Sequence, residues 1–64
     1  MIRVRIIGEE KYREFSGKIT PLDIFSEMNL NPDEWLVVHN GKVIADDDVV
    51  EEGEIILIPV VSGG

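Results

Sequence analysis

Glu54-Ile55-Ile56-Leu57-Ile58-Pro59 is the segment that decides the fold of this 64-residue chain. Its four consecutive apolar residues would put hydrophobic side chains on both faces of a strand, which is typical of a strand inside a sheet. The preceding turn, Glu51-Glu52-Gly53, contains a glycine that can adopt a positive φ. Pro59 has no N–H to continue a hydrogen-bonded ladder. We therefore expect a central last strand that ends at Pro59.

Two hairpins are predicted to supply the neighbours of this strand. Residues 2–7 alternate apolar and basic side chains, and residues 12–16 can return as a second strand after a turn. Residues 35–39 and 42–44 flank Asn40-Gly41, a strong signal for a two-residue hairpin turn. The apolar face of the first strand holds Ile2, Val4 and Ile6, and the opposite face holds Arg3, Arg5 and Ile7. The last strand fits between the hairpins, beside the first strand.

One short helix is predicted between the two hairpins. Thr20 is expected to be its N-cap, with Pro21 at the first helical position and Asp23 near the positive end of the helix dipole. Asn29 is expected to end the helix, because asparagine tolerates the left-handed cap conformation. The predicted apolar stripe comprises Leu22, Ile24, Phe25 and Met28. The predicted fold class is therefore α+β: a mixed sheet, element order ββαβββ, with one helix packed across one face.

The composition restricts which functions are open to the chain. Thirteen acidic and six basic residues give a net charge of −7, which disfavours nucleic-acid binding because phosphate neutralisation supplies most of its affinity. There is no cysteine, so neither a disulfide nor a thiol nucleophile is expected. No apolar run is long enough for a signal peptide or a membrane span. We expect a cytoplasmic protein that is a monomer when alone and contacts neither nucleic acid nor membrane.

The sequence after the last strand is Val60-Val61-Ser62-Gly63-Gly64. We expect residues 1–59 to form the globular domain and residues 60–64 to form a flexible tail. Without a Cβ, glycine can enter a slot too narrow for any other residue. The carboxylate of Gly64 becomes electrophilic only after a partner activates it. The Gly-Gly pair therefore predicts a reactive terminus, and the alternative is that the two glycines are incidental.

Other polar residues are expected to be structural. Asp46, Asp47 and Asp48 suggest calcium, but consecutive acids do not match the spacing of a calcium loop, so a solvated loop is expected. His39 has no predicted partner to orient it as a base or ligand, and Ser62 lacks a His-Asp context for a nucleophile. No acid–base pair, metal cluster or phosphate loop can be assembled from the sequence. We therefore expect no catalytic residue, no metal site, no bound cofactor and no enzymatic activity.

The whole chain resembles the β-grasp, ubiquitin-like sulfur carriers: ThiS, MoaD and the archaeal small modifier proteins. The hairpin and the acidic-Gly turn resemble ThiS, the ending resembles MoaD, and the opening strand and turn resemble the archaeal modifiers. The resemblance rests on Val4-Arg5-Ile6-Ile7-Gly8-Glu9-Glu10, Val37-Val38-His39-Asn40-Gly41-Lys42-Val43-Ile44, Glu51-Glu52-Gly53-Glu54-Ile55-Ile56 and Pro59-Val60-Val61-Ser62-Gly63-Gly64.

The resemblance implies that an E1-like enzyme uses ATP to adenylate Gly64. The product would become a thiocarboxylate whose sulfur passes to a synthase for molybdopterin or thiazole, or to tRNA thiolation. Two alternatives remain open. In the first, the activated Gly64 is joined to lysines of target proteins; in the second, the chain is a non-covalent interaction module. By analogy with the modifiers, Lys11, Lys18 and Lys42 are possible sites of self-conjugation.

The predicted docking face for the activating enzyme is the sheet face opposite the helix. Exposed apolar patches rimmed by polar groups mark interfaces, and this face should carry arginines beside apolar residues of the last strand. The predicted docking residues are Arg3, Arg5, Ile56, Ile58, Val60, Val61 and Ser62, next to the reactive Gly63 and Gly64. The alternative is that Arg3 and Arg5 are only solvated.

Overall fold

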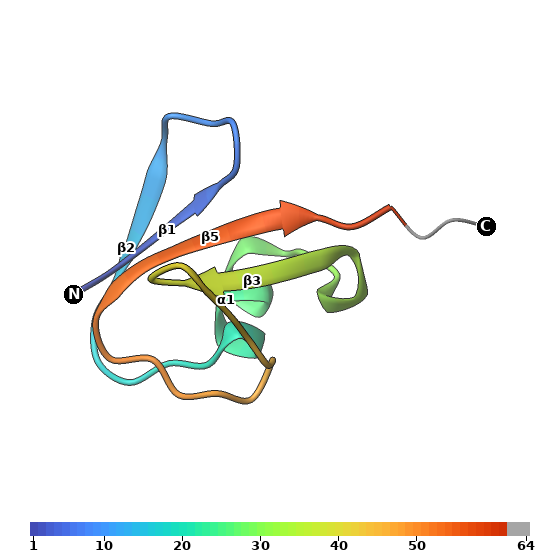
Figure 1. Ribbon diagram of the computed structural model, residues 1–64. Helices are drawn as coiled ribbons and strands as arrows, with labels where there is room; N and C mark the ends of the chain where they lie inside the picture. Colours follow the sequence, from blue (N-terminus) through green and yellow to red (C-terminus); the bar gives the residue numbers. More distant parts are fainter. Residues whose placement is uncertain (62–64) are drawn as a thin grey trace.

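The computed structural model of the protein describes residues 1–61 and confirms an α+β fold with a mixed sheet and one α-helix. Figure 1 shows the longest strand running across the molecule, with the helix against one side of the sheet. In chain order the elements are β1 (Ile2–Ile6), β2 (Tyr12–Phe15), α1 (Pro21–Met28), a 3-10 turn η1 (Pro32–Glu34), β3 (Trp35–His39), β4 (Lys42–Ile44) and β5 (Gly53–Pro59).

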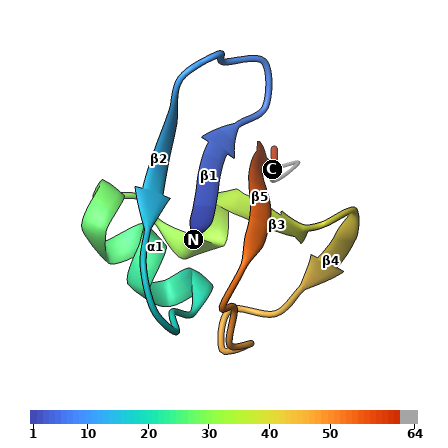
Figure 2. The same cartoon turned by 90° about the vertical axis from the view of Figure 1, so that its left-hand side faces the viewer.

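The spatial order of the strands is β2-β1-β5-β3-β4, which Figure 2 shows from left to right. β5 is therefore the central strand, as its uninterrupted apolar sequence predicts. It runs parallel to β1, with Val4 beside Ile55, and antiparallel to β3, with Val37 beside Leu57. The antiparallel β1–β2 hairpin forms one side of the sheet, and the antiparallel β3–β4 hairpin forms the other.

The hydrophobic core lies between one face of the sheet and α1. The sheet supplies alternate residues of its three inner strands, and the helix supplies two large side chains. The fully buried apolar side chains are Ile2, Val4, Ile24, Phe25, Val37, Val50, Ile55 and Leu57. We call the helix-covered side of the sheet the inner face and the opposite side the outer face.

The apolar stripe of α1 differs from the predicted one at its first position. Leu22 is 47% exposed, whereas Pro21 is buried together with Ile24 and Phe25. The reason is the helical period of about 3.6 residues. Pro21 lies three and four residues before Ile24 and Phe25, while Leu22 is rotated away from that stripe.

Both ends of α1 form as the sequence predicts. The Thr20 N–H donates to Asp23 Oδ2 (2.9 Å) and the Asp23 N–H donates to Thr20 Oγ1 (3.4 Å), so the two residues form a capping box. Asn29 has φ 58°, in the left-handed region, and ends the helix. The Leu30 N–H then donates to the Phe25 carbonyl oxygen (2.8 Å), which places Leu30 against the core.

Replacing Thr20 by alanine should lower the free energy of unfolding by about 1 kcal/mol. The Asp23 N–H would lose its acceptor, Thr20 Oγ1, and the bond from the Thr20 N–H to Asp23 depends on residue 20 keeping its N-cap conformation. Urea unfolding followed by circular dichroism measures the change. Ser26→Ala, in an exposed position of the same helix, is the matched control and should cost nothing, since alanine is the better helix former. Equal losses for the two variants would contradict the role of the cap.

A few boundaries differ from the predictions. β1 ends at Ile6, and Ile7 is half exposed beyond the strand. In the loop before β5, Val50 is buried and the adjacent Val49 is exposed. Val50 is held by a two-way backbone pairing with Ile19 (2.9 and 2.7 Å), an isolated bridge that no local sequence signal predicts.

Candidate functional site

The residues that follow β5 are exposed to solvent at one end of the sheet. Pro59 lies opposite Trp35 as the last residue of the strand. The last strand ends at Pro59, as predicted. One further backbone hydrogen bond follows it, in which the Val60 N–H donates to the Glu34 carbonyl oxygen (2.8 Å). Val61 is 91% exposed. The side chain of Val61 is therefore free to contact another molecule.

The reactive residues predicted from the sequence, Gly63 and Gly64, lie outside the described residues, and so does Ser62. The candidate site described by the structure is thus the approach to these residues. It consists of Val60, Val61 and the outer face of the sheet beside the end of β5.

The strand register places a set of apolar side chains together on the outer face. Ile56 of β5 is opposite Val38 of β3, Ile58 is opposite Leu36, and Val38 is opposite Val43 of β4. Directly opposed residues of paired strands share a face. Leu36 is 38% and Val43 63% exposed, and the other three are half-buried. We call Leu36, Val38, Val43, Ile56 and Ile58 the outer patch.

Arg3 and Arg5 lie on the same face, as predicted, on the β1 side of the outer patch. Arg5 is directly opposite Ile56 and Arg3 is opposite Glu54. The Arg3 guanidinium carbon is 4.9 Å from the centre of the Tyr12 ring, a cation–π distance. Arg5 Nη1 approaches the Glu9 carbonyl oxygen at 3.5 Å, a marginal hydrogen bond. Both side chains thus have neighbours within the β1–β2 hairpin and form a basic border to the apolar residues.

The outer patch is larger than the set predicted from the sequence. The sequence predicts only Ile56 and Ile58 of the last strand at this position, whereas β3 and β4 supply three further residues. A signal for them was present: the Asn40-Gly41 turn fixes the hairpin register, and Val38 must then face away from the core if Val37 faces it.

The remaining polar candidates have structural roles. Asp48 Oδ2 accepts the Ala45 N–H (2.8 Å), so this carboxylate closes its own loop. His39 Nε2 lies 2.7 Å from the Glu52 carbonyl oxygen, which ties the end of β3 to the turn before β5. Among residues 1–61, no group of three or more acidic or histidine side chains is placed to hold a metal ion.

A scan of the chain against models of known protein families finds no match. Within the described part of the chain, no helix has the length and apolar character needed to cross a lipid bilayer. The structure places the exposed Val60 and Val61, which precede the Gly-Gly pair in the sequence, beside an apolar patch with a basic border.

Proposed function

We propose that the chain is a β-grasp, ubiquitin-like sulfur carrier whose Gly64 carboxylate is activated by an ATP-using enzyme. One observation supports this most strongly. The central strand leads to an exposed Val60 and Val61 at one end of a sheet whose outer face carries the apolar outer patch. A partner that grips the outer patch would hold the following glycines in a fixed direction, so binding and presentation are linked.

The chemistry proposed for Gly64 is acyl substitution in two steps. First, a carboxylate oxygen of Gly64 attacks the α-phosphorus of ATP, which forms an acyl-adenylate and releases pyrophosphate. A hydrosulfide equivalent supplied by the partner system then attacks the carbonyl carbon and displaces AMP, which leaves a thiocarboxylate. The amine of a lysine in place of sulfide would give an isopeptide bond by the same substitution. The carrier itself contributes only the acyl group.

The glycines suit this chemistry because an adenylating site must enclose the carboxylate. Gly63 and Gly64 present no Cβ, so a narrow groove can close around the backbone. Val60 and Val61 supply apolar contacts immediately before that groove. The net charge of −7 favours a partner whose docking surface is basic.

The experiment that tests the proposal is intact-mass spectrometry of the protein after incubation with an E1-like enzyme from the same organism, ATP and sulfide. We expect a mass gain equal to one sulfur replacing one oxygen, located by fragmentation at Gly64. A reaction without ATP and a variant lacking Gly64 are the controls, and both should keep their starting mass. If the complete reaction also leaves the mass unchanged, with the enzyme shown to be active on its own carrier, the proposal is wrong.

A further inference from the structure

Asn40 is the asparagine of this chain best suited to react with its own backbone. The chain has three asparagines: leucine follows Asn29, proline follows Asn31 and glycine follows Asn40. The backbone nitrogen after an asparagine can attack the side-chain carbonyl carbon, and asparagine is accordingly a labile residue. A leucine side chain obstructs that attack and proline has no N–H to lose, whereas glycine imposes neither limit. The sequence therefore makes Asn40-Gly41 the reactive pair.

The reaction of this pair needs no catalyst, and water is its only co-reactant. The Gly41 nitrogen loses its proton and bonds to Asn40 Cγ, and Asn40 Nδ2 leaves with a proton as ammonia. The five-membered ring that forms is a succinimide. Water then opens either of the two ring C–N bonds at the Gly41 nitrogen, which gives aspartate or isoaspartate at position 40. Asn40 and Gly41 are both exposed, so water can reach the ring.

The fold holds Asn40 in a conformation that does not suit ring closure. Asn40 has φ 48°, in the left-handed region. Ring closure needs the Asn40 Cβ to eclipse the Gly41 nitrogen about the Cα–C bond, and the ψ of the left-handed region does not allow this. Asn40 also pairs with Glu54 in both directions. Its N–H donates to the Glu54 carbonyl oxygen (3.0 Å), and its Oδ1 accepts the Glu54 N–H (3.0 Å). The reaction must therefore break this pairing.

Gly53 leaves the space that the Asn40 side chain occupies. Gly53 begins β5 with a positive φ, and a Cβ there would overlap the side-chain amide of Asn40. The neighbouring His39 is also tied to this turn, because its Nε2 lies 2.7 Å from the Glu52 carbonyl oxygen. The β3–β4 turn is thus fastened to the start of β5 on two successive residues.

We infer that Asn40 is a site of spontaneous covalent modification, at which the contact with Gly53 and Glu54 suppresses succinimide formation. Local opening between the β3–β4 turn and the start of β5 releases the reaction. Isoaspartate puts an extra methylene into the backbone of a two-residue turn, so it disturbs the pairing of His39 with Lys42. Aspartate keeps an oxygen that can accept the Glu54 N–H. The site takes no part in the acyl chemistry, so the inference is independent of the proposed function.

The test compares the folded protein with a peptide of residues 37–44, both in mildly alkaline buffer made with ¹⁸O water. Opening of the succinimide incorporates a solvent oxygen at residue 40, which mass spectrometry of the digested samples locates. We expect the folded protein to react at Asn40 at least about tenfold more slowly than the peptide.

Hydrogen exchange measures the opening independently, because the Glu54 N–H is released when its bond to Asn40 breaks. The fold should slow the covalent reaction at least as much as it slows exchange of the Glu54 N–H. Equal reaction rates in protein and peptide, or a reaction at Asn29 before Asn40, would overturn the inference. This comparison needs no variant, so it decides the inference even where a substitution prevents folding.

Two glycine variants show whether the contact itself suppresses the reaction. Gly53→Ala displaces the Asn40 side chain and should speed the reaction at least about tenfold. Gly8→Ala also puts alanine at a positive φ, but nothing lies within 4 Å of its Cβ, so it should speed the reaction less than about threefold. Equal acceleration by the two variants contradicts the inference. So does an acceleration by Gly53→Ala no greater than its globally unfolded fraction explains, with that fraction taken from urea unfolding.

Discussion

Replacing Gly53 by alanine is expected to lower the free energy of unfolding by about 2–4 kcal/mol, a large share of the stability of a domain this small. Gly53 begins β5 with φ 110°, a backbone conformation that residues with a side chain rarely adopt. A Cβ at this position would lie 2.5 Å from Oδ1 and 2.6 Å from Nδ2 of Asn40. The Asn40 side chain would have to move, and Asn40 Oδ1 would lose the Glu54 N–H that it accepts at 3.0 Å.

Three further variants separate these causes: Gly8→Ala, Asn40→Gly, and Asn40→Gly combined with Gly53→Ala. Gly8 has φ 85° with nothing within 4 Å of a Cβ, so Gly8→Ala should cost only the backbone strain of about 1–2 kcal/mol. In an Asn40→Gly background the obstructing side chain is absent, and Gly53→Ala should then cost about as little as Gly8→Ala. Urea unfolding of the parent, Gly53→Ala, Asn40→Gly and the protein with both substitutions measures the cycle. A cost for Gly53→Ala that is unchanged by Asn40→Gly would show that the contact with Asn40 is unimportant.

Elements whose stability comes from local chemistry were predictable from the sequence. Thr20, Pro21 and Asp23 fix the start of α1 within one turn, and Asn29 ends it. The Asn40-Gly41 turn forms with positive φ at both residues (48° and 87°), as a two-residue hairpin turn requires. The central position of β5 was predictable for a different reason: only a strand with neighbours on both edges and cover on one face can accommodate so many apolar residues.

Features that depend on contacts distant in sequence were not predictable. The bridge between Ile19 and Val50 joins segments thirty-one positions apart, and neither segment carries a strand pattern. Leu22 and Pro21 are adjacent, and which one faces the core depends on how the helix is rotated on the sheet. In the second hairpin, Trp35-Leu36-Val37-Val38 is apolar throughout and shows no alternation. The Asn40-Gly41 turn fixes how its residues pair, but local sequence leaves open which of them face the core.

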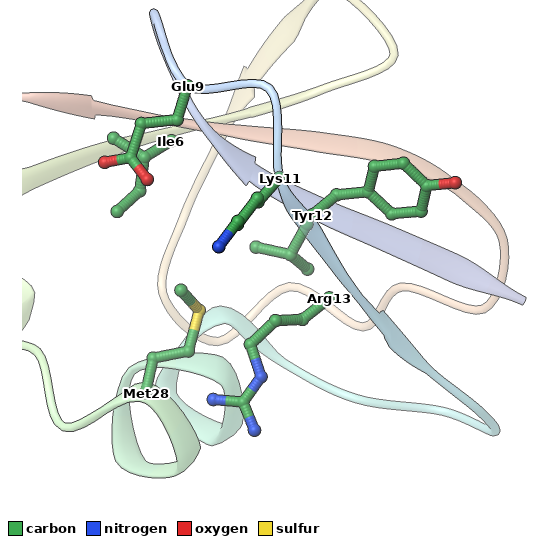
Figure 3. Close-up of a pocket in the computed structure, with 7 residues that line it drawn as sticks. Ile6, Glu9, Lys11, Tyr12, Arg13 and Met28 are labelled. Carbon is green, nitrogen blue, oxygen red and sulfur yellow. The ribbon is translucent and has the colours of Figure 1, made fainter.

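The same distinction applies to the candidate site. Arg3, Arg5, Ile56 and Ile58 were correctly placed on one face, because β1 alternates clearly and β5 pairs with it in register. The cavity that Figure 3 shows between the β1–β2 hairpin and α1 is not predictable from local sequence, because it requires Met28 of the helix to lie close to Val4 and Ile6 on the inner face. Such a space results from packing between two elements, and neither sequence segment specifies it alone.

Replacing Leu36 by glutamate is expected to reduce the rate of Gly64 activation at least about thirtyfold, provided that the activating enzyme grips the outer patch. A hot-spot residue of an apolar interface contributes about 2 kcal/mol or more, and a buried unpaired carboxylate adds a desolvation cost. Leu36 is suitable because it is 38% exposed and lies opposite Ile58, next to the end of β5. Ile56→Glu, in the middle of the patch, should have an equal or larger effect.

The control must carry the same apolar-to-acid change away from the patch. Val49 is 63% exposed in the loop before β5, and Val49→Glu should leave the activation rate within about threefold of the parent. Pyrophosphate release at limiting carrier concentration gives kcat/KM for each variant, and thermal unfolding shows whether each is folded. A folded Leu36→Glu protein activated as fast as Val49→Glu would show that the outer patch is not the docking surface. The mass measurement alone would then test the proposed chemistry at Gly64, because it does not depend on which face the enzyme binds.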